Sequence, residues 1–373
     1  MKLLNTTRLE KPVKPAFKPR FKVSLIAASS LLAMGMHGVV SAADVTVYGY
    51  AKADFVFSSD QNTGKTVGVG GLDTTPGLAG ESSFQASAEE SRLGVTVNNG
   101  QFSATVEGDY FGGKLRLRHA YGQYGNVTAG QTWTTFGERD WIAYPRTLDF
   151  DTPVGLVANR PTQLRITAGN FDFAIENPSA TISAAAEGVS ARSAVPDLVA
   201  RYASKGDAFS WMLSGLLRNA EVDGGAADGE SASVVGIMAA ARLNLGSAGA
   251  LSATLMQNGN NRGNNYGAGG DFVVVGNQLE SVDSTAFSVA FQGNAGPNSS
   301  YNLVYSEFSF DDEYAGILGA GSPETLTTLH ANYIYSPTAK MDYGIEVSRA
   351  EREDYSGNSA DNTRLQMSVQ YNF

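Results

Sequence analysis

The chain has 373 residues, no cysteine, and 27 basic against 37 acidic side chains, which gives a formal net charge of −10. The lack of cysteine excludes disulfides, thiolate metal sites, thiol nucleophiles and a lipoprotein anchor. The 42 glycines, 16 tyrosines and 18 phenylalanines favour many short strands closed by turns. A charged fraction of 17% with both signs mixed argues against a disordered chain.

The first 43 residues differ in composition from the rest of the chain. A basic stretch precedes a mostly apolar run at 23–40, and Ser41, Ala42 and Ala43 offer small residues for cleavage. This pattern predicts a Sec-type signal peptide at residues 1–43. An uncleaved membrane anchor is the alternative, because the apolar run is just long enough to span a bilayer, although serines and a histidine dilute it. A start codon placed too far upstream would also explain the long basic stretch.

The mature domain, residues 44–373, is acidic and has no second long apolar run. Removing the 7 basic residues and 1 acidic residue of the signal leaves 20 basic and 36 acidic side chains, a formal charge of −16. This charge argues against nucleic acid as a partner. If the domain spans a membrane, it has to do so as a closed barrel, because open sheet edges cannot be satisfied in lipid.

Alternation of apolar and polar residues begins at once in the mature domain, at residues 45–57. A glycine-rich stretch without period at 58–83 predicts a loop. Residues 84–97 and 101–111 predict two further strands joined by a tight turn at 98–100. Each predicted strand carries its charges on one face only, because successive side chains point to opposite sides.

The stretch LRLRHAYGQYGNVTAGQTWTTF, at residues 115–136, predicts a hairpin that turns at Gly125 and Asn126. Arg116 and Arg118 share one face of its first arm. The opposite face carries Leu115, Leu117, His119 and Tyr121. In a membrane barrel the apolar face meets lipid and the arginines line the lumen.

Short turns and longer connections alternate along the rest of the chain. Short turns are predicted at 98–100, 125–126, 168–170, 205–207, 246–249, 295–298 and 336–339. Longer connections are predicted at 58–83, 136–159, 179–196, 220–230, 259–280, 311–323 and 353–361, with 112–113 as a short exception. The sequence therefore predicts an all-β fold, a transmembrane antiparallel β-barrel of about 16 strands with both mature ends in the periplasm.

The later strands have the clearest lipid-facing pattern. Uncharged apolar sets at period two include Phe209, Trp211, Leu213 and Leu217, then Leu251, Ala253 and Leu255, and then Phe287, Val289 and Phe291. Aromatic residues often end these runs, where ring and hydroxyl suit the membrane interface. The last strand alternates up to Phe373, which resembles the signal that the outer-membrane barrel assembly machinery reads.

Strand parity places a set of arginines on the lumen face. They are Arg92, Arg116, Arg118, Arg165, Arg201, Arg218, Arg242 and Arg364. Guanidinium groups held there attract anions and can hold a carboxylate by paired hydrogen bonds. The alternative is that they pair with carboxylates of neighbouring strands and only stiffen the wall. The candidate partners are Glu90, Glu107, Asp109 and Glu176.

Three segments resemble a known family. RLRHAYGQYG, AGQTWTTF, and TLDF followed by PVG at 147–155 are similar to the DcaP-like trimeric porins of Gram-negative outer membranes. The resemblance implies a homotrimer that takes up small anionic solutes such as dicarboxylates through an arginine-bearing constriction. Members of the family can carry a helical coiled-coil extension before the barrel. Here the first strand begins within a few residues of the predicted cleavage site, which puts such a stalk in doubt.

The long connection at 137–159 is predicted to fold into the lumen, since loops of this length are often functional and the resemblance covers part of it. Its candidate constriction residues are Arg139, Trp141, Tyr144, Arg146, Asp149 and Asp151. Folded inward, the loop would narrow the pore with aromatic and charged groups. The alternative is a solvated surface loop.

The pattern as a whole predicts an outer-membrane porin through which small hydrophilic solutes diffuse, with no enzymatic activity, cofactor or metal. Asp149 and Asp151 begin a stretch similar to a calcium loop, but its twelfth residue is Arg160 where a bidentate Glu is needed. His119 and His330 lack a second His at ligand spacing. The alternatives are an outer-membrane barrel enzyme of the phospholipase or protease type, which needs a partnered His or Ser, and an adhesin or translocator barrel.

The expected partners are outer-membrane lipid, lipopolysaccharide and copies of the same chain. Polar residues point outward on the early strands, where a lone barrel would meet hydrocarbon: Ser87, Glu89, Ser91, His119 and Gln131. Small residues there would let backbones approach closely: Gly49, Ala51, Ala53, Ala104, Gly108 and Ala129. This face predicts self-association through strands one to five.

Overall fold

The computed structural model describes residues 43–78, 80–137, 142–151, 153–183, 188–258 and 269–373. The predicted signal peptide therefore lies outside the described residues, apart from Ala43. Residues 43–373 form one compact unit. Among the described residues, no helix has the length and apolar character needed to cross a membrane.

This unit is a closed antiparallel β-barrel with 16 strands in its wall, as the alternation predicts. Its first half contains β1 (Asp44–Ser58), β2 (Ser83–Ser87), β3 (Arg92–Asn98), β4 (Phe102–Asp109), β5 (Arg116–Tyr124), β6 (Val127–Gln131), β7 (Thr162–Ala168) and β8 (Phe171–Glu176). The wall continues with β10 (Ser190–Arg192), β11 (Asp197–Ser204), β12 (Phe209–Asp223), β13 (Ser231–Asn244) and β14 (Gly249–Gln257). It ends with β17 (Ser284–Asn294), β18 (Ser299–Phe310), β19 (Pro323–Thr338), β20 (Met341–Asp354) and β21 (Ser359–Asn372).

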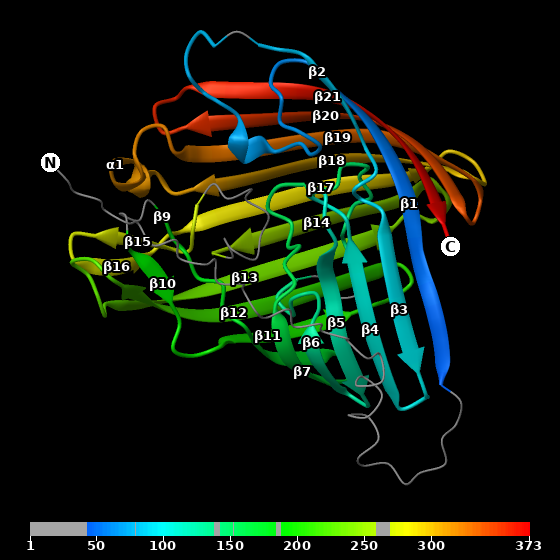
Figure 1. The fold of residues 1–373 in the computed structure, drawn as a ribbon, viewed down its shortest axis with the longest axis horizontal. Coiled ribbons are helices and arrows are strands. Elements are labelled where there is room, and N and C mark those ends of the chain that lie inside the picture. The colour runs from blue at the N-terminus through cyan, green and yellow to red at the C-terminus, as the bar shows by residue number, and fades with distance from the viewer. Residues whose placement is uncertain (1–42, 79, 138–141, 152, 184–187, 259–268) are drawn as a thin grey trace, which may run out of the picture. The chain divides into compact units, whose positions relative to one another are not determined.

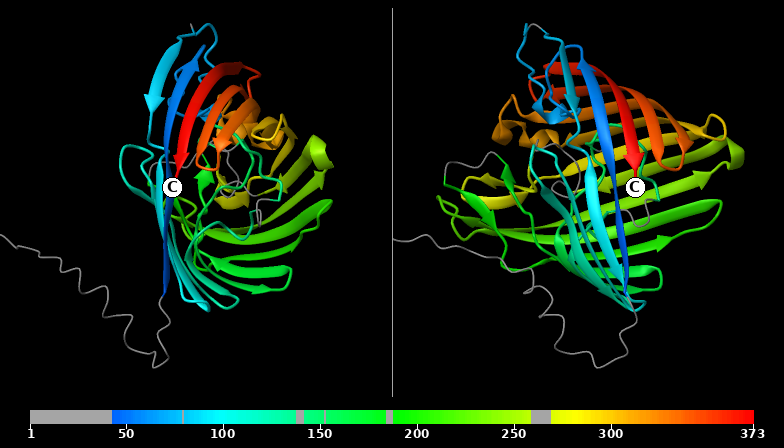
Figure 2. Two further views of the ribbon diagram at one scale, coloured as in Figure 1. Left: turned by 90° about the vertical axis from the view of Figure 1, so that its right-hand side faces the viewer. Right: turned by 45° about the vertical axis from the view of Figure 1, so that its right-hand side comes forward.

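Pairing of the first and last strands closes the barrel, and both lie side by side in Figures 1 and 2. Two wall positions are each built from two short strands. The pair β2 and β3 shares β1 as neighbour, and the pair β10 and β11 shares β12. The single strand predicted at 84–97 is therefore wrong in detail, because residues 88–91 leave the ladder.

The longer connections carry small elements of their own. A three-stranded sheet joins β9 (Ile182–Ser183), β15 (Phe272–Val275) and β16 (Gln278–Ser281) outside the barrel ladder. Short helical turns occur at η1 (Val69–Gly71), η2 (Gly246–Ala248), η3 (Asp312–Tyr314) and α1 (Ala315–Leu318). The tight connections at the opposite strand ends match the predicted short turns, so one end of the barrel is elaborate and the other simple, as in outer-membrane barrels.

Side-chain burial alternates along the strands as predicted. On β12, Leu213 and Leu217 are exposed on the outer surface, whereas Met212 and Leu216, which each directly precede one of them, are buried. The same holds on β13, where Ile237 is exposed and Met238 is buried. Exposed apolar residues dominate the outer faces of these strands, which is the pattern of a lipid-facing surface.

A β-bulge between β4 and β5 changes the parity of the central hairpin. Gly108 pairs with Leu117, but the next residue, Glu107, pairs with His119, so Arg118 is an extra residue in β5. His119 is therefore buried on the lumen side, and Tyr121 follows it there. The prediction that these two residues share the outward face of Leu117 was wrong, because one inserted residue reverses the alternation after it.

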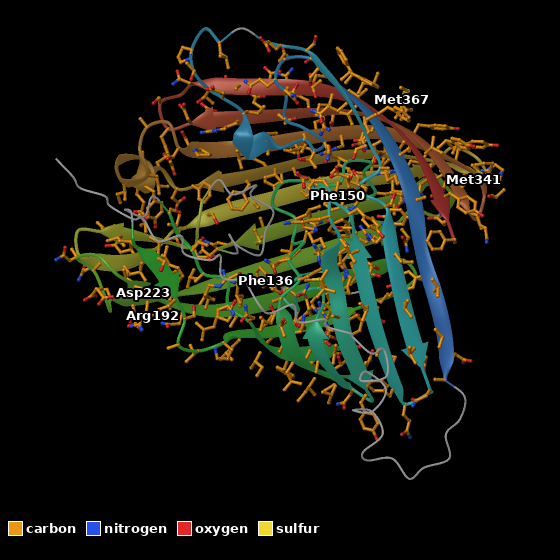
Figure 3. All side chains as sticks on the ribbon, in the orientation of Figure 1. Phe136, Phe150, Arg192, Asp223, Met341 and Met367 are labelled. Atoms are coloured by element: carbon orange, nitrogen blue, oxygen red, sulfur yellow. The ribbon has the colours of Figure 1, made fainter. Side chains whose placement is uncertain are left out.

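The lumen contains an apolar core in addition to polar groups. The long connection between β6 and β7 brings Phe136, Ile142 and Val154 into contact with wall residues such as Met212 and Met238. Phe136 is fully buried, and the labelled side chains of Phe136 and Phe150 project within the outline of the barrel (Figure 3). Burial of these groups fixes the loop inside the barrel and leaves only part of the lumen for solvent.

Candidate functional site

The constriction loop is defined as residues 132–161, and its described residues lie in the lumen and bond to several walls. Near its start, Ser214 of β12 donates to the Phe136 carbonyl (2.6 Å), and Arg201 of β11 donates to the Gly137 carbonyl (2.7 Å). Further along, the Val154 amide donates to Thr328 of β19 (3.3 Å). The prediction that this connection folds into the lumen is confirmed.

The middle of the loop is anchored by one carboxylate on β20. Glu346 accepts hydrogen bonds from the Leu148 amide (2.8 Å) and the Asp149 amide (3.3 Å). The same carboxylate accepts from Asn332 (2.8 Å) and lies 3.1 Å from His330 Nδ1. One buried anion thus satisfies two loop amides and two side chains of β19, an arrangement that defines the path of the backbone at this point.

Further contacts hold the same turn from the seam of the barrel. Lys52 of β1 and Gln366 of β21 both donate to the Leu148 carbonyl, at 2.7 and 3.0 Å. Arg364 of β21 forms an ion pair with Asp149, and both side chains are buried. The strands β19 to β21 and β1 therefore act as the anchor of the loop.

Between the loop and the opposite wall lies a cavity of about 600 Å³, the main cavity. It is lined by Arg92, Glu107, Arg116, Arg118, His119, Trp133, Tyr144, Pro145, Arg146, Thr147, Asp149, Phe150, Asp151, Ala158 and Arg160. Five of these residues are arginines and three are carboxylates. The lining is thus basic, although the whole chain has a formal charge of −10.

Two arginines of β5 are partly neutralised in the wall. Arg116 forms a two-pronged contact with Asp109, at 3.0 and 2.8 Å. Arg118 bonds to Glu107 (3.1 Å) and to Asp109 (2.8 Å), and its side chain is 4% exposed. The wall pairing considered from the sequence therefore exists, but Arg116 keeps 39% of its side-chain surface exposed toward the cavity.

Aromatic rings position these guanidinium groups. Phe111 and Phe150 stack at 4.3 Å, and Arg116 lies over both rings, at 5.2 and 5.4 Å. Arg118 lies 5.8 Å from the rings of Phe150 and Trp133. Contacts between cations and ring faces hold the planar groups without using their hydrogen-bond donors.

Arg160, at the end of the loop, was missed by the sequence prediction of the site. It lies over the Trp133 ring at 4.6 Å and donates to the Ala158 carbonyl at 3.3 Å. It has no ion pair with any described carboxylate. Burial, and then the nearby charges of Arg118 and Arg116, lower the pKa of Arg160 to about 9. The guanidinium remains charged at neutral pH and faces positive potential that described carboxylates do not cancel.

Residue type alone gave no indication of Arg160, because it follows no strand alternation. In the sequence, Arg160 stands out only as the twelfth residue of a stretch that cannot bind calcium. The signal that could have found it is the predicted inward fold of the loop, since both ends of such a loop have to pass close to the wall. The same argument would have found Trp133, which lies at the start of the constriction loop.

The predicted loop residues fall into two groups. Tyr144, Arg146, Asp149 and Asp151 all line the main cavity. Arg139 and Trp141 lie outside the described residues. Burial, and then the charge of Asp149, raise the pKa of Asp151 to about 7, so this carboxyl titrates near neutral pH.

The remaining predicted arginines do not gather in one place. Arg92 lines the main cavity, 3.6 Å from Glu107. Arg218 is fully buried and pairs with Asp197 and Asp271. Three others lie apart: Arg201 is paired with Asp172, Arg242 bonds to Asn244 and Gln292, and Arg165 lines a separate cavity.

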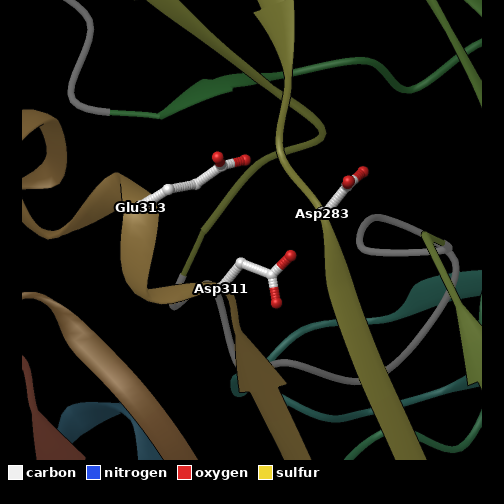
Figure 4. Close-up of side chains that lie close together, drawn as sticks. All are labelled: Asp283, Asp311 and Glu313. Atoms are coloured by element: carbon white, nitrogen blue, oxygen red, sulfur yellow. The ribbon is translucent and has the colours of Figure 1, made fainter.

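A cluster of three carboxylates lies on the connections at the elaborate end of the barrel. Asp283, Asp311 and Glu313 each place one oxygen within 4.8 Å of the others (Figure 4). Asp311 and Glu313 are exposed. Burial, and then the charge of Asp283, raise the pKa of Asp311. Ordinary solvation explains exposed carboxylates of this kind, and the cluster lies far along the chain from the arginine residues of the main cavity.

Comparison with known proteins identifies the architecture. A family model described as DcaP outer membrane protein matches residues 39–373. The outer membrane channel DcaP of Acinetobacter baumannii shares 24% identity with a TM-score of 0.78, over 89% of this chain and 97% of that chain. An anion-selective porin from Comamonas acidovorans shares 13% identity with a TM-score of 0.59, over 89% and 100%. OmpF of Salmonella typhi, in complex with daunomycin, shares 11% identity with a TM-score of 0.56, over 88% and 97%. Curated protein sequences contain no match to the chain.

Proposed function

The chain belongs to the DcaP outer membrane protein family and is an outer-membrane channel with a porin barrel, and we propose that its lumen favours small anionic, dicarboxylate-like solutes. The observation that carries the proposal is the composition of the main cavity. Five arginines face three carboxylates there, in a chain that is acidic overall. A cleft lined by one sign of charge raises the local concentration of the opposite ion.

The arrangement of the arginines suits a solute with two carboxylates. Arg116 projects from β5, whereas Arg146 and Arg160 belong to the constriction loop, so guanidinium groups border the cavity from the wall and from the loop. A guanidinium can hold a carboxylate by two parallel hydrogen bonds. A dicarboxylate can therefore engage both sides at once, whereas a monocarboxylate engages one.

The test is block of single-channel current by succinate, compared with acetate, in the wild type and in R116Q/R160Q. Removing two charges next to the solute weakens the block by succinate by about fivefold or more per charge, because one ion pair at contact distance is worth ~1 kcal/mol even in water. Arg118 stays in place, so Asp109 and Glu107 keep a partner.

R242Q is the matched control, because Arg242 carries the same charge in the lumen but does not line the main cavity. A wild-type channel that succinate blocks no better than acetate contradicts the preference for dicarboxylates. Equal loss of block in R242Q and R116Q/R160Q contradicts the assignment of the site.

The described contacts favour neither of the alternative functions. His330 is part of the loop anchor through Glu346, and His119 bonds to Thr132 at 3.1 Å on the lumen side. Among the described residues, neither histidine faces a serine or aspartate nucleophile at a surface, as an outer-membrane hydrolase requires. The lumen is crossed by the chain's own loop, which suits a diffusion channel.

The proposed assembly is a homotrimer built on the outer faces of β1 to β6. Small outward residues remain there, among them Ala51, Ala104 and Ala129. His119 no longer supports this face, since it points into the lumen, and the outward Gln131 already donates to the Arg118 carbonyl at 3.1 Å. Three copies is the number that the porin resemblance implies. Native mass spectrometry in mild detergent tests it, and a monomer in every detergent contradicts it.

A further inference from the structure

A second lumen cavity, the exit cavity, lies beside the main cavity. It has a volume of about 400 Å³ and is lined by Gln123, Gly125, Asn126, Thr128, Trp133, Thr134, Arg165, Thr167, Asp172 and Arg201. Trp133 lines both cavities. Gly125 and Asn126 form the short turn between β5 and β6, so the exit cavity lies toward the simple, short-turn end of the barrel. Short turns of outer-membrane barrels face the periplasm.

Arg165 is the available cation of this cavity. It lies on β7 opposite Thr128 and Ala174, both buried, while its sequence neighbours Leu164 and Ile166 are exposed on the outer surface. Its side chain therefore faces the lumen. Its Nε atom is buried and has no hydrogen-bond partner, and among the described residues Arg165 forms no ion pair.

The carboxylate of the same cavity is already engaged. Asp172 accepts from Arg201 through Oδ2, at 3.0 and 2.8 Å, and from Thr167 through Oδ1 at 2.5 Å. Two arginines and one aspartate line the exit cavity, which leaves one positive charge. A buried guanidinium donor without a partner is unfavourable unless an anion or water satisfies it.

We propose that the exit cavity is a second anion-binding subsite, in which Arg165 receives a carboxylate as the solute passes Trp133 from the main cavity. The inference rests on the proposed function, because it names a second step on the same path. Asn126, Thr128 and Gln123 supply hydrogen-bonding groups around Arg165. Two weak subsites in series let an anion enter from either end without being trapped, since release from one is coupled to capture by the next.

The experiment measures succinate block in channels of one orientation, with succinate added from either side. In R165Q the rate of block from the short-turn side is expected to fall about fivefold, whereas the rate from the opposite side is preserved. R165K retains the charge and is expected to keep most of the short-turn rate. R242Q, which removes a lumen arginine that lines neither cavity, is expected to match the wild type.

The outcomes separate this inference from the proposed function. Wild-type channels that succinate blocks from neither side overturn the proposed function, and the subsite with it. Block from both sides that R165Q leaves unchanged overturns the subsite alone. A fall in R165K as large as that in R165Q also overturns it, because a charge-based subsite tolerates lysine. The heat-stable electrophoretic mobility of each variant shows that the barrel has folded.

Discussion

Two walls of the lumen use charged side chains in opposite ways. The arginine wall carries Arg92, Arg116 and Arg118 on β3 and β5, and it faces the main cavity. The anchoring wall, on β19 to β21, carries His330, Asn332, Glu346, Arg364 and Gln366, and all of them are buried against the constriction loop or one another. On the first wall Arg116 and, in part, Arg92 keep side-chain surface open to the main cavity, with 39% and 23% exposed, whereas Arg118 is buried. On the second wall the charged side chains are all engaged with the loop or with one another.

Strand parity decides which arginines face the lumen, but it does not decide which of them are exposed there. Arg116 and Arg364 have the same lumen-facing parity, yet 39% of the Arg116 side chain is exposed and only 1% of the Arg364 side chain is. The difference arises from Asp149 of the loop, which reaches one wall and not the other. A lumen arginine can therefore contact a solute only where the loop leaves space in front of it.

The largest expected effect comes from removing the anchor. E346A leaves two loop amides, His330 and Asn332 without their shared acceptor, and loss of one partner of a buried charged network costs about 3–5 kcal/mol. The loop should detach from the anchoring wall, so single-channel conductance and current noise should both rise. S348A, a buried lumen residue on the same strand, is the control. If E346A has the conductance of the wild type, the apolar contacts of the loop are sufficient to hold it in the lumen without Glu346.

A smaller effect concerns the charge of the main cavity. The pKa of Asp151 is raised to about 7, so acidification from about pH 8 to about pH 6 neutralises this carboxyl and makes the cavity more positive. Anion preference, measured as a reversal potential, should therefore rise as the pH falls. D151N should show the anion preference of the low-pH wild type at every pH, with no change between about pH 8 and about pH 6. If the preference of D151N still changes over this pH range, another group is responsible for the titration.

The smallest effect concerns the β-bulge at Arg118, within the arginine wall. Gln131 donates to the carbonyls of Leu117 and Arg118, at 3.3 and 3.1 Å, and so satisfies the backbone at the inserted residue. Q131A should lower the free energy of unfolding by about 1 kcal/mol, the usual worth of such bonds, while anion preference stays unchanged. The urea midpoint of the folded barrel measures it. A change in selectivity without a change in stability would contradict this purely structural role.

The sequence predicted much of the fold because period-two alternation and turn residues are local signals. The strand number and the short turns follow from them, whereas the inward fold of the loop was predicted from its length and from the family resemblance. The bulge at Arg118 could not be predicted, since one extra residue has no signature of its own and reverses the parity of His119 and Tyr121. Arg160 and the partners of Arg364 depend on where the loop crosses the lumen, which is a property of packing between residues far apart in the chain.

We propose that the arginine wall and the loop, and not the net charge of the chain, set the ion preference of the channel. The reversal potential of the wild-type channel in a KCl gradient at neutral pH tests it most directly. We expect a potential displaced toward the chloride equilibrium value, although the chain is acidic. A potential displaced toward the potassium value, which persists when the exposed acidic connections are neutralised, would contradict it.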